Sequence, residues 1–290
     1  MFIATLIAAG RLRDDDLARA SEIAGGGELR WIDAGDAADL LLGPVDDWRD
    51  LRDRLEAGLP GVDVIVQPAE EREKRLFVAD MDSTMVGQEC IDELADFAGK
   101  KAEIAAVTER AMQGELDFAE ALHHRVAALN GLGVGCIERC RTERVTPNAG
   151  ARTLVRTMRA RGAKTLLVTG GFHDFADPLA SELGFVEVRA NYLESIFGHL
   201  TGRVAGEIVD AAAKARALIE LREELKLPKA AVLAVGDGAN DAPMIEEAGL
   251  GVAYRGKPKL DAVADARLRN NDLTALLWAQ GIPKAEWLED

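Results

Sequence analysis

The chain has few cysteines, no excess of basic residues and no long uninterrupted apolar segment. Three cysteines in 290 residues are typical of reduced cytosolic thiols and argue against a disulfide framework. Cys136 and Cys140 have no second pair of ligands beside them, so we interpret both as helix positions and not as a zinc site. The sequence contains no apolar window long enough for a membrane span, and Met1 to Gly10 lacks the basic n-region of a signal peptide. We therefore expect a cytoplasmic protein without a membrane partner.

Basic residues are outnumbered by acidic ones. Lys and Arg total 35 against 50 Asp and Glu, which gives a formal net charge of −15. A nucleic-acid-binding surface needs a basic stripe, so we expect no nucleic-acid partner. The same charge opposes the approach of any anionic substrate. Phosphate chemistry in this chain would therefore depend on local attraction from a metal ion, a few cations or helix N-termini.

Residues 1–70 predict a small α+β domain. The predicted elements, in the order βαββαβ, are strand Phe2–Ala8, helix Asp14–Ala24, strands Glu28–Ile32 and Ala38–Leu42, helix Asp46–Leu55 and strand Val62–Val66. This order resembles that of ACT-like regulatory domains, which commonly bind amino acids or pair across subunits. The charged stretch 70–75 that follows predicts a linker.

From residue 76 to residue 290 the pattern changes to alternating strands and helices. The predicted strands are Leu76–Ala79, Thr165–Val168, Val186–Ala190, Ala231–Val235 and Leu250–Ala253. Short buried strands separated by long helices indicate a parallel sheet with helices on both faces, a three-layer Rossmann-like α/β fold. The first two strands are too far apart for a simple crossover. Residues from about 86 to 146 have helical spacing, and we expect them to form an inserted helical cap.

Polar residues follow the predicted strands at their carboxyl ends, where open parallel sheets bind their ligands. Asp80 and Asp82 follow the first strand, Thr169 and Gly170 the second, and Asp237 a later one. Each fragment alone is ordinary loop chemistry. Because all of them belong to one edge of one sheet, we expect these side chains to lie together and to form a single site.

The residue types at this edge suit phosphoryl transfer. Asp80 is a carboxylate, already ionised at neutral pH, and is the predicted nucleophile. Asp82, two residues on, is the predicted general acid and base. Mg²⁺ prefers hard oxygen ligands, which Asp80, the backbone carbonyl of Asp82 and Asp237 would supply. The cation of Lys214 would stabilise charge on the transferring oxygens.

Four further groups complete the predicted phosphate site. Thr169 offers a hydroxyl, and Gly170 lets backbone N–H groups approach the phosphoryl group closely. Asn240 and Asp241 would orient Asp237, the metal-bound waters or Lys214. The combined set resembles the four-motif signature of the haloacid dehalogenase-like hydrolases, carried by Asp80-Met81-Asp82-Ser83-Thr84, Thr169, Lys214 and Gly236-Asp237-Gly238-Ala239-Asn240-Asp241. That resemblance covers residues 76 to about 255 and implies a Mg²⁺-dependent aspartyl-phosphate mechanism.

The cap residues suggest the substrate. Glu89, Met112, Phe118 and Arg125 occur in an order and spacing that resemble the phosphoserine phosphatase family. The resemblance implies that Glu89 pairs with a substrate ammonium, that Arg125 grips a carboxylate, and that Met112 and Phe118 close an apolar lid. Taken singly, apolar residues on cap helices are more often core residues. Thr169 stands where this family usually has serine, so the hydroxyl is kept with an added methyl.

The implied reaction is hydrolysis of O-phospho-L-serine to L-serine and phosphate, the last step of serine biosynthesis. Two alternatives stay open. One is a related phosphatase or phosphotransferase that acts on another small metabolite. The other is an amino-acid-sensing module built on residues 1–70. The chain's four histidines show no triad arrangement, which disfavours a histidine-phosphatase mechanism. The oligomeric state is also open, and a homodimer is one alternative.

Overall fold

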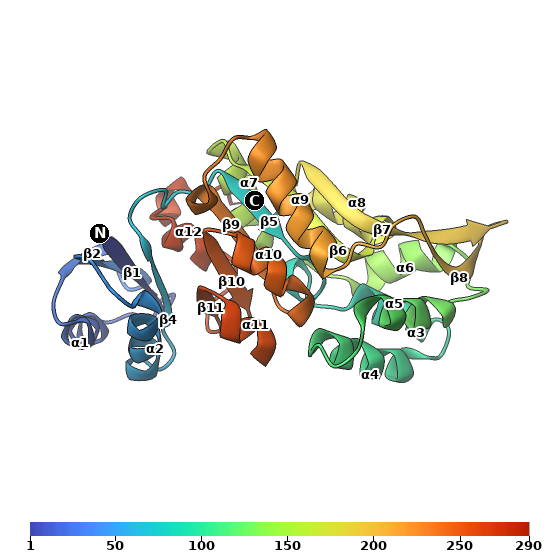
Figure 1. Cartoon of the computed structure of the whole chain (residues 1–290), viewed down its shortest axis with the longest axis horizontal. Helices are drawn as coiled ribbons and strands as arrows, with labels where there is room; N and C mark the ends of the chain where they lie inside the picture. Colours follow the sequence, from blue (N-terminus) through green and yellow to red (C-terminus); the bar gives the residue numbers. More distant parts are fainter. Residues whose placement is uncertain (290) are drawn as a thin grey trace.

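A computed structural model, which describes residues 1–289, shows an N-terminal α+β part, a central sheet with helices on both faces, and a helical cap (Figure 1). Across these residues no helix combines the length and apolarity that crossing a membrane requires.

The N-terminal part is a four-stranded antiparallel sheet with two helices on one face. Its strands, in the order β2-β3-β1-β4, are β1 (Phe2–Ile7), β2 (Glu28–Asp33), β3 (Ala37–Leu42) and β4 (Asp63–Pro68). Helices α1 (Asp14–Ala24) and α2 (Trp48–Gly58) cover the face that carries Leu6, Leu40 and Val64. The βαββαβ order is the split arrangement expected from the sequence. The resemblance to ACT-like domains stays a prediction.

The other face of this sheet packs against the rest of the chain through buried polar groups. Thr5 donates a hydrogen bond to Asp39 (2.9 Å), and two nitrogens of Arg72 contact the same carboxylate at 2.7 Å. Lys74 is also buried and donates to the carbonyl of Ala230 (2.9 Å). Two cations of the charged stretch that we predicted as a linker are therefore not solvated, because Arg72 pairs with a buried carboxylate of the sheet and Lys74 donates to backbone carbonyls.

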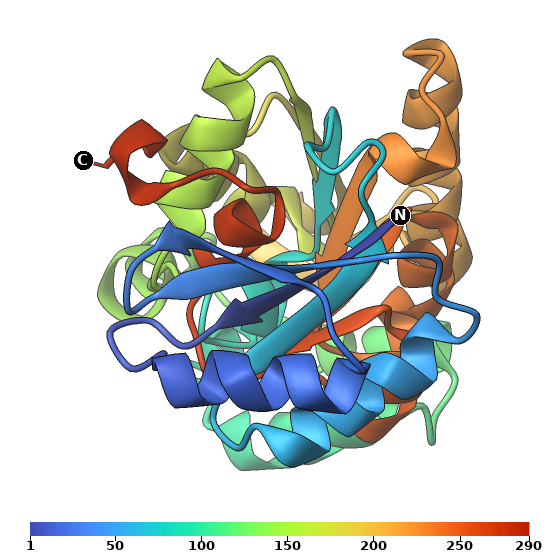
Figure 2. The same cartoon turned by 90° about the vertical axis from the view of Figure 1, so that its left-hand side faces the viewer.

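Residues from the C-terminal third complete this interface. The carboxylate of Asp63 accepts hydrogen bonds from the backbone N–H groups of residues 269–271 and from the side chain of Asn271 (2.7 Å). The indole of Trp278 donates to Asp33 (2.7 Å). Figure 2 shows the N-terminal strands lying across this end of the molecule. The sheet of residues 1–68 thus has two helices on one face, and on the other a contact that joins these polar groups to the buried apolar side chains of Ile7 and Ile65.

The central sheet has seven strands in the order β11-β10-β9-β5-β6-β7-β8. They are β5 (Leu76–Ala79), β6 (Lys164–Phe172), β7 (Glu187–Ile196), β8 (His199–Ala205), β9 (Val232–Gly236), β10 (Leu250–Tyr254) and β11 (Ala266–Leu268). All neighbours pair in parallel except β7 and β8, which form an antiparallel hairpin. The mostly parallel α/β fold predicted from the sequence is confirmed.

Helices cover both faces of the sheet, which explains why its strands are apolar throughout. Phe77 of β5 faces α7 (Ala151–Ala160), α8 (His173–Leu183) and α12 (Ala275–Ala279). Val78 faces the opposite layer, made by α9 (Ala211–Glu224), α10 (Ala242–Glu247) and α11 (Pro258–Val263). Because β5 is central and buried on both sides, the residue that follows it is held at the middle of the sheet edge.

The cap consists of α3 (Cys90–Asp96), α4 (Lys101–Met112), α5 (Phe118–Ala127) and α6 (Gly135–Arg144), inserted between β5 and β6. Two contacts join the cap to the chain after β10. The ammonium of Lys257 lies 2.8 Å from a carboxylate oxygen of Glu109, and that of Lys259 donates to the carbonyl of Gly114 (2.7 Å). The cap therefore lies closed over the carboxyl end of the sheet.

Candidate active site

Asp80 is held at the carboxyl end of β5. Its backbone N–H donates to the carbonyl of Val235 (3.0 Å), which continues the pairing with β9 by one residue. Its carboxylate accepts from the N–H of Met81 (2.7 Å) and lies 2.8 Å from the ammonium of Lys214. The side chain is buried, and this desolvation, with Asp241 nearby, raises its pKa to about 7 although Lys214 opposes the rise.

A tight reversal of the chain brings Asp82 beside Asp80. Asp82 has extended backbone angles and Ser83 has a φ of 53°, in the left-handed region. Such a conformation costs a non-glycine residue about 1–3 kcal/mol. The hydroxyl of Ser83 offsets part of this cost by donating to Glu89 (2.7 Å). The carboxylate of Asp82 accepts from the N–H of Cys90 (3.1 Å), and burial raises its pKa.

Lys214 is a fully buried cation between two carboxylates. Helix α9 presents it after Asp210, whose side chain caps the helix by accepting from the N–H of Ala213 (2.8 Å). The ammonium lies 2.8 Å from Asp80 and 2.7 Å from Asp241. Burial alone would lower the pKa of Lys214, but the two carboxylates raise it, so the residue stays charged.

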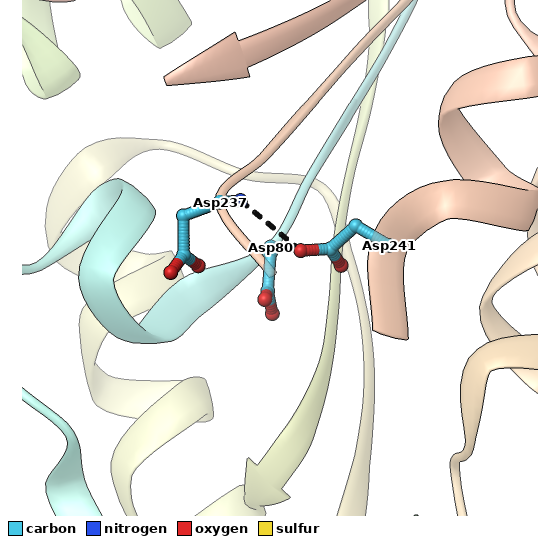
Figure 3. Close-up of side chains that lie close together, drawn as sticks. All are labelled: Asp80, Asp237 and Asp241. Carbon is cyan, nitrogen blue, oxygen red and sulfur yellow. Dashed lines mark hydrogen bonds between the residues drawn. The ribbon is translucent and has the colours of Figure 1, made fainter. Parts of the chain in front are cut away.

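Three carboxylates converge at the ends of β5 and β9. Oxygens of Asp80, Asp237 and Asp241 lie within 4.8 Å of one another (Figure 3). Burial and the neighbouring carboxylates raise the pKa of Asp237 well above its ordinary value. Repulsion of this kind is relieved by a cation, and oxygen donors suit a divalent metal ion. The residues therefore fit a metal site.

Within this group Asp241 has the least freedom to bind a metal. One of its oxygens accepts the Lys214 ammonium (2.7 Å), and the other accepts the N–H groups of Asp237 and Gly238 (3.1 Å each). Within residues 1–289 the carboxylate of Asp237 accepts one hydrogen bond, a longer one, from the hydroxyl of Thr84 (3.3 Å). Asp80 and Asp237 are thus the better placed ligands. Asp82 was also predicted as a ligand, through its carbonyl, and its carboxylate lies outside the group.

The end of β6 forms the opposite wall. The hydroxyl of Thr169 accepts from the N–H of Gly171 (2.8 Å). A Cβ atom on Gly170 would lie 2.5 Å from the ring of Phe118, so any larger residue here would require that ring to shift. Asn191 fixes the loop by donating to the carbonyl of Gly170 (2.8 Å) and accepting from Val209 (2.8 Å). Sequence reasoning missed Asn191, because nothing local distinguishes it from a surface amide.

These walls and the cap enclose one pocket. The predicted site residues that line it are Asp80, Asp82, Glu89, Met112, Phe118, Arg125, Thr169, Gly170 and Asn240. Lys214, Asp237 and Asp241 lie directly behind Asp80. Burial and the charge of Asp82 raise the pKa of Glu89 to about 8. The pocket thus has the carboxylate of Asp80 on the sheet side and a buried cation, Arg125, on the cap side.

Comparison with known proteins places the chain in a family. A family model for haloacid dehalogenase-like hydrolases matches residues 74–249. A phosphoserine phosphatase of Archaeoglobus fulgidus is 46% identical over 79% of this chain and 67% of its own length. The chain spans 52% to 67% of the length of the first curated relatives that it matches.

Solved structures are similar in fold as well. One, described as a phospho-aspartyl intermediate analogue of phosphoserine phosphatase, is 36% identical with a TM-score of 0.68 and covers 71% of this chain and 98% of its own. A probable phosphoserine phosphatase from Vibrio cholerae is 31% identical with a TM-score of 0.73 and covers 96% of this chain and 88% of its own. The second similarity therefore includes the N-terminal part.

Proposed function

The chain belongs to the haloacid dehalogenase-like hydrolases, and on that premise we propose that it hydrolyses O-phospho-L-serine to L-serine and phosphate. One observation carries the proposal. A single enclosed pocket brings together a buried carboxylate, Asp80, as the nucleophile, a buried guanidinium, Arg125, and a half-buried carboxyl group, Glu89. An amino-acid phosphate carries a carboxylate and an ammonium group, so its pocket needs one cationic and one anionic partner for them. Relatives named phosphoserine phosphatase support the same substrate.

The reaction proceeds in two displacements at phosphorus. An oxygen of Asp80 attacks, the bond to the serine oxygen breaks, and Asp82 gives its proton to the departing alkoxide. Asp82 is suited to carry that proton because burial raises its pKa. A water then attacks the aspartyl-phosphate, Asp82 takes up its proton, and Asp80 is released as a carboxylate.

The surrounding groups stabilise charge during both steps. Lys214 offsets the negative charge of Asp80 and of the transferring oxygens. The Thr169 hydroxyl and the backbone beside Gly170 face the same space. We infer that Mg²⁺ is the metal, held by Asp80, the Asp82 carbonyl and Asp237, and when bound it neutralises phosphate charge. Phe118 closes the pocket against Gly170 and keeps water from the reacting phosphate.

The metal site predicts a pH-dependent stability. The carboxyl groups of Asp80 and Glu89 have folded-state pKa values raised to about 7 and about 8. Their stabilising contribution is full below their unfolded values near 4 and is lost as the pH rises through the folded ones. In EDTA the free energy of unfolding should fall by several kcal/mol between pH 5 and pH 8, since Asp80 and Glu89 each contribute about 1.4 kcal/mol per pH unit until its folded-state pKa is reached.

Added Mg²⁺ should offset the part of this loss that belongs to Asp80 at pH 8 and do little at pH 5, because metal ligands must be deprotonated. At about 100 times its Kd the ion contributes about 2.7 kcal/mol. Urea unfolding at both pH values, with EDTA and with Mg²⁺, measures the effect, and Asp237→Asn is the control that should lose the Mg²⁺ response. Equal stabilisation by Mg²⁺ at the two pH values would contradict the assignment.

Arg125→Ala tests the substrate. The change removes the only guanidinium that lines the pocket among residues 1–289, and a lost charge-assisted contact to carboxylate costs roughly 2–3 kcal/mol. We expect kcat/KM for L-phosphoserine to fall about 100-fold. The measurement is phosphate release with Mg²⁺ from a panel of phosphomonoesters, run beside wild type.

The panel separates the alternatives. O-Phosphoethanolamine, which lacks the carboxylate, should be turned over equally by wild type and Arg125→Ala. Arg110→Ala, an exposed arginine paired with Glu115 on the cap surface, is the matched control and should change neither substrate. Equal effects of Arg125→Ala on both substrates, with another ester preferred by wild type, would favour a different small-metabolite phosphatase.

A further inference from the structure

A buried polar chain ends at Arg125, and its other two members, Asp92 and Thr108, do not line the pocket. It runs from the carboxylate of Asp92 through the hydroxyl of Thr108 to the guanidinium. We propose that Thr108 and Asp92 are positioning residues, which aim Arg125 into the pocket and keep part of its guanidinium available for the substrate carboxylate. This inference rests on the proposed phosphoserine activity.

Each member comes from a different cap helix. Asp92 is on α3, Thr108 on α4 and Arg125 on α5, and all three side chains are buried. The Thr108 hydroxyl lies 2.6 Å from Asp92 and 3.2 Å from Nη1 of Arg125. These hydrogen bonds connect the three helices, so the orientation of the Arg125 side chain depends on how the cap helices pack together.

The direction of these hydrogen bonds follows from the groups. A guanidinium only donates and a carboxylate only accepts, whereas a hydroxyl has one proton to give. Thr108 also lies 3.1 Å from the carbonyl of Ile104, a longer contact than the one to Asp92. The hydroxyl proton therefore points to Asp92, and a hydroxyl lone pair accepts from Arg125. Asp92 in this way fixes Thr108 as an acceptor.

The Thr108 hydroxyl lies between Asp92 and Arg125, and this matters because a direct ion pair with Asp92 would occupy the donors of the guanidinium. Arginine and carboxylate usually form two parallel hydrogen bonds, which would leave less for a ligand. Here Nε donates to the carbonyl of Ala121 (3.2 Å) and Nη1 to Thr108, while Nη2 has no acceptor within residues 1–289. The charge of Asp92 still compensates the buried cation. Arg125 thus keeps donors for a substrate carboxylate in the pocket that it lines.

The test replaces the hydroxyl by a methyl group. Thr108→Val keeps the side-chain shape, and we expect it to raise the KM for L-phosphoserine roughly tenfold with kcat nearly unchanged. The inhibition constant of inorganic phosphate, which contains no carboxylate, should stay at the wild-type value. Thr108→Ser should restore the KM. Thr157→Val removes an equally buried hydroxyl outside the pocket and should leave both constants unchanged.

A second variant covers the case in which Thr108→Val does not fold. Asp92→Asn should also raise the KM. Because the two residues act through one contact, the double variant should raise the KM no more than the single variant that has the larger effect. Two results would overturn the inference: equal changes in the KM and in the inhibition constant of phosphate, or a KM that Thr108→Ser does not restore. Failure of wild type itself to hydrolyse phosphoserine would instead remove the proposed function, so the two failures are distinct.

Discussion

Replacing Asp80 by Asn should lower phosphoserine hydrolysis by about 10⁴-fold or more, the scale on which loss of a nucleophile acts. The amide has the shape of the carboxylate but no charge with which to attack phosphorus. Its neighbours at the strand end, including Lys214, stay in place. Initial rates of phosphate release measure the loss, and rapid acid quenching with ³²P-labelled substrate should label wild type but not the variant.

The control for this change is Asp177→Asn. Asp177 is an exposed carboxylate on α8 that pairs with His173 and does not line the pocket. Its loss should leave both the rate and the labelling unchanged. Labelled Asp80→Asn protein, or a rate within tenfold of wild type, would show that another residue accepts the phosphoryl group.

Lys214→Met should reduce kcat by about 10³-fold, because the preorganised cation that stabilises the transferring charge is gone. The same change leaves Asp80 and Asp241 buried without their shared counter-ion. Breaking a buried pair in this way costs roughly 3 kcal/mol of stability. The pKa of Asp80 should also rise further, since the cation that opposes the effect of burial is absent. The acid limb of the pH profile of kcat should therefore move to higher pH.

Rate, urea unfolding and the pH profile measure the three effects of Lys214→Met together. Lys226→Met, an exposed lysine just after the same helix, is the matched control and should change none of them. A stable variant with normal kcat would contradict the role of Lys214. Loss of stability with an unmoved acid limb would indicate that Lys214 supports packing and does not control Asp80.

The sheet edge could be predicted because its signals are local. Four apolar residues, Leu76–Ala79, form a strand buried on both faces, and the first polar residue after such a strand must lie at the ligand-binding edge. The same reasoning applies to Thr169 and Asp237. The strand at residues 76–79 could be predicted without knowing its neighbouring strands, since four consecutive apolar residues already indicate burial on both faces.

The rest of the site depends on contacts between distant segments. The left-handed backbone of Ser83 follows from the turn that carries Asp82 toward Cys90, and nothing in the residue itself indicates it. The polar chain behind Arg125 joins three helices, so its members look like ordinary helix residues in the sequence. The contact of Arg72 with Asp39 could not be predicted either. A run of charged residues predicts solvent exposure, and Asp39 lies next to Arg72 only in the folded chain.

The polar face of the N-terminal sheet also has a consequence for the order in which the chain folds during synthesis. Residues 1–68 leave the ribosome before residues 269–278 and can pack α1 and α2 on their sheet at once. The carboxylate of Asp63, however, accepts from residues 269–271, and that of Asp33 accepts from Trp278 and Lys284. Until the C-terminal donors of these hydrogen bonds are made, the carboxylates of Asp63 and Asp33 face water on one side of the nascent sheet. Residues 1–68 are therefore made well before the residues that complete their hydrogen bonds.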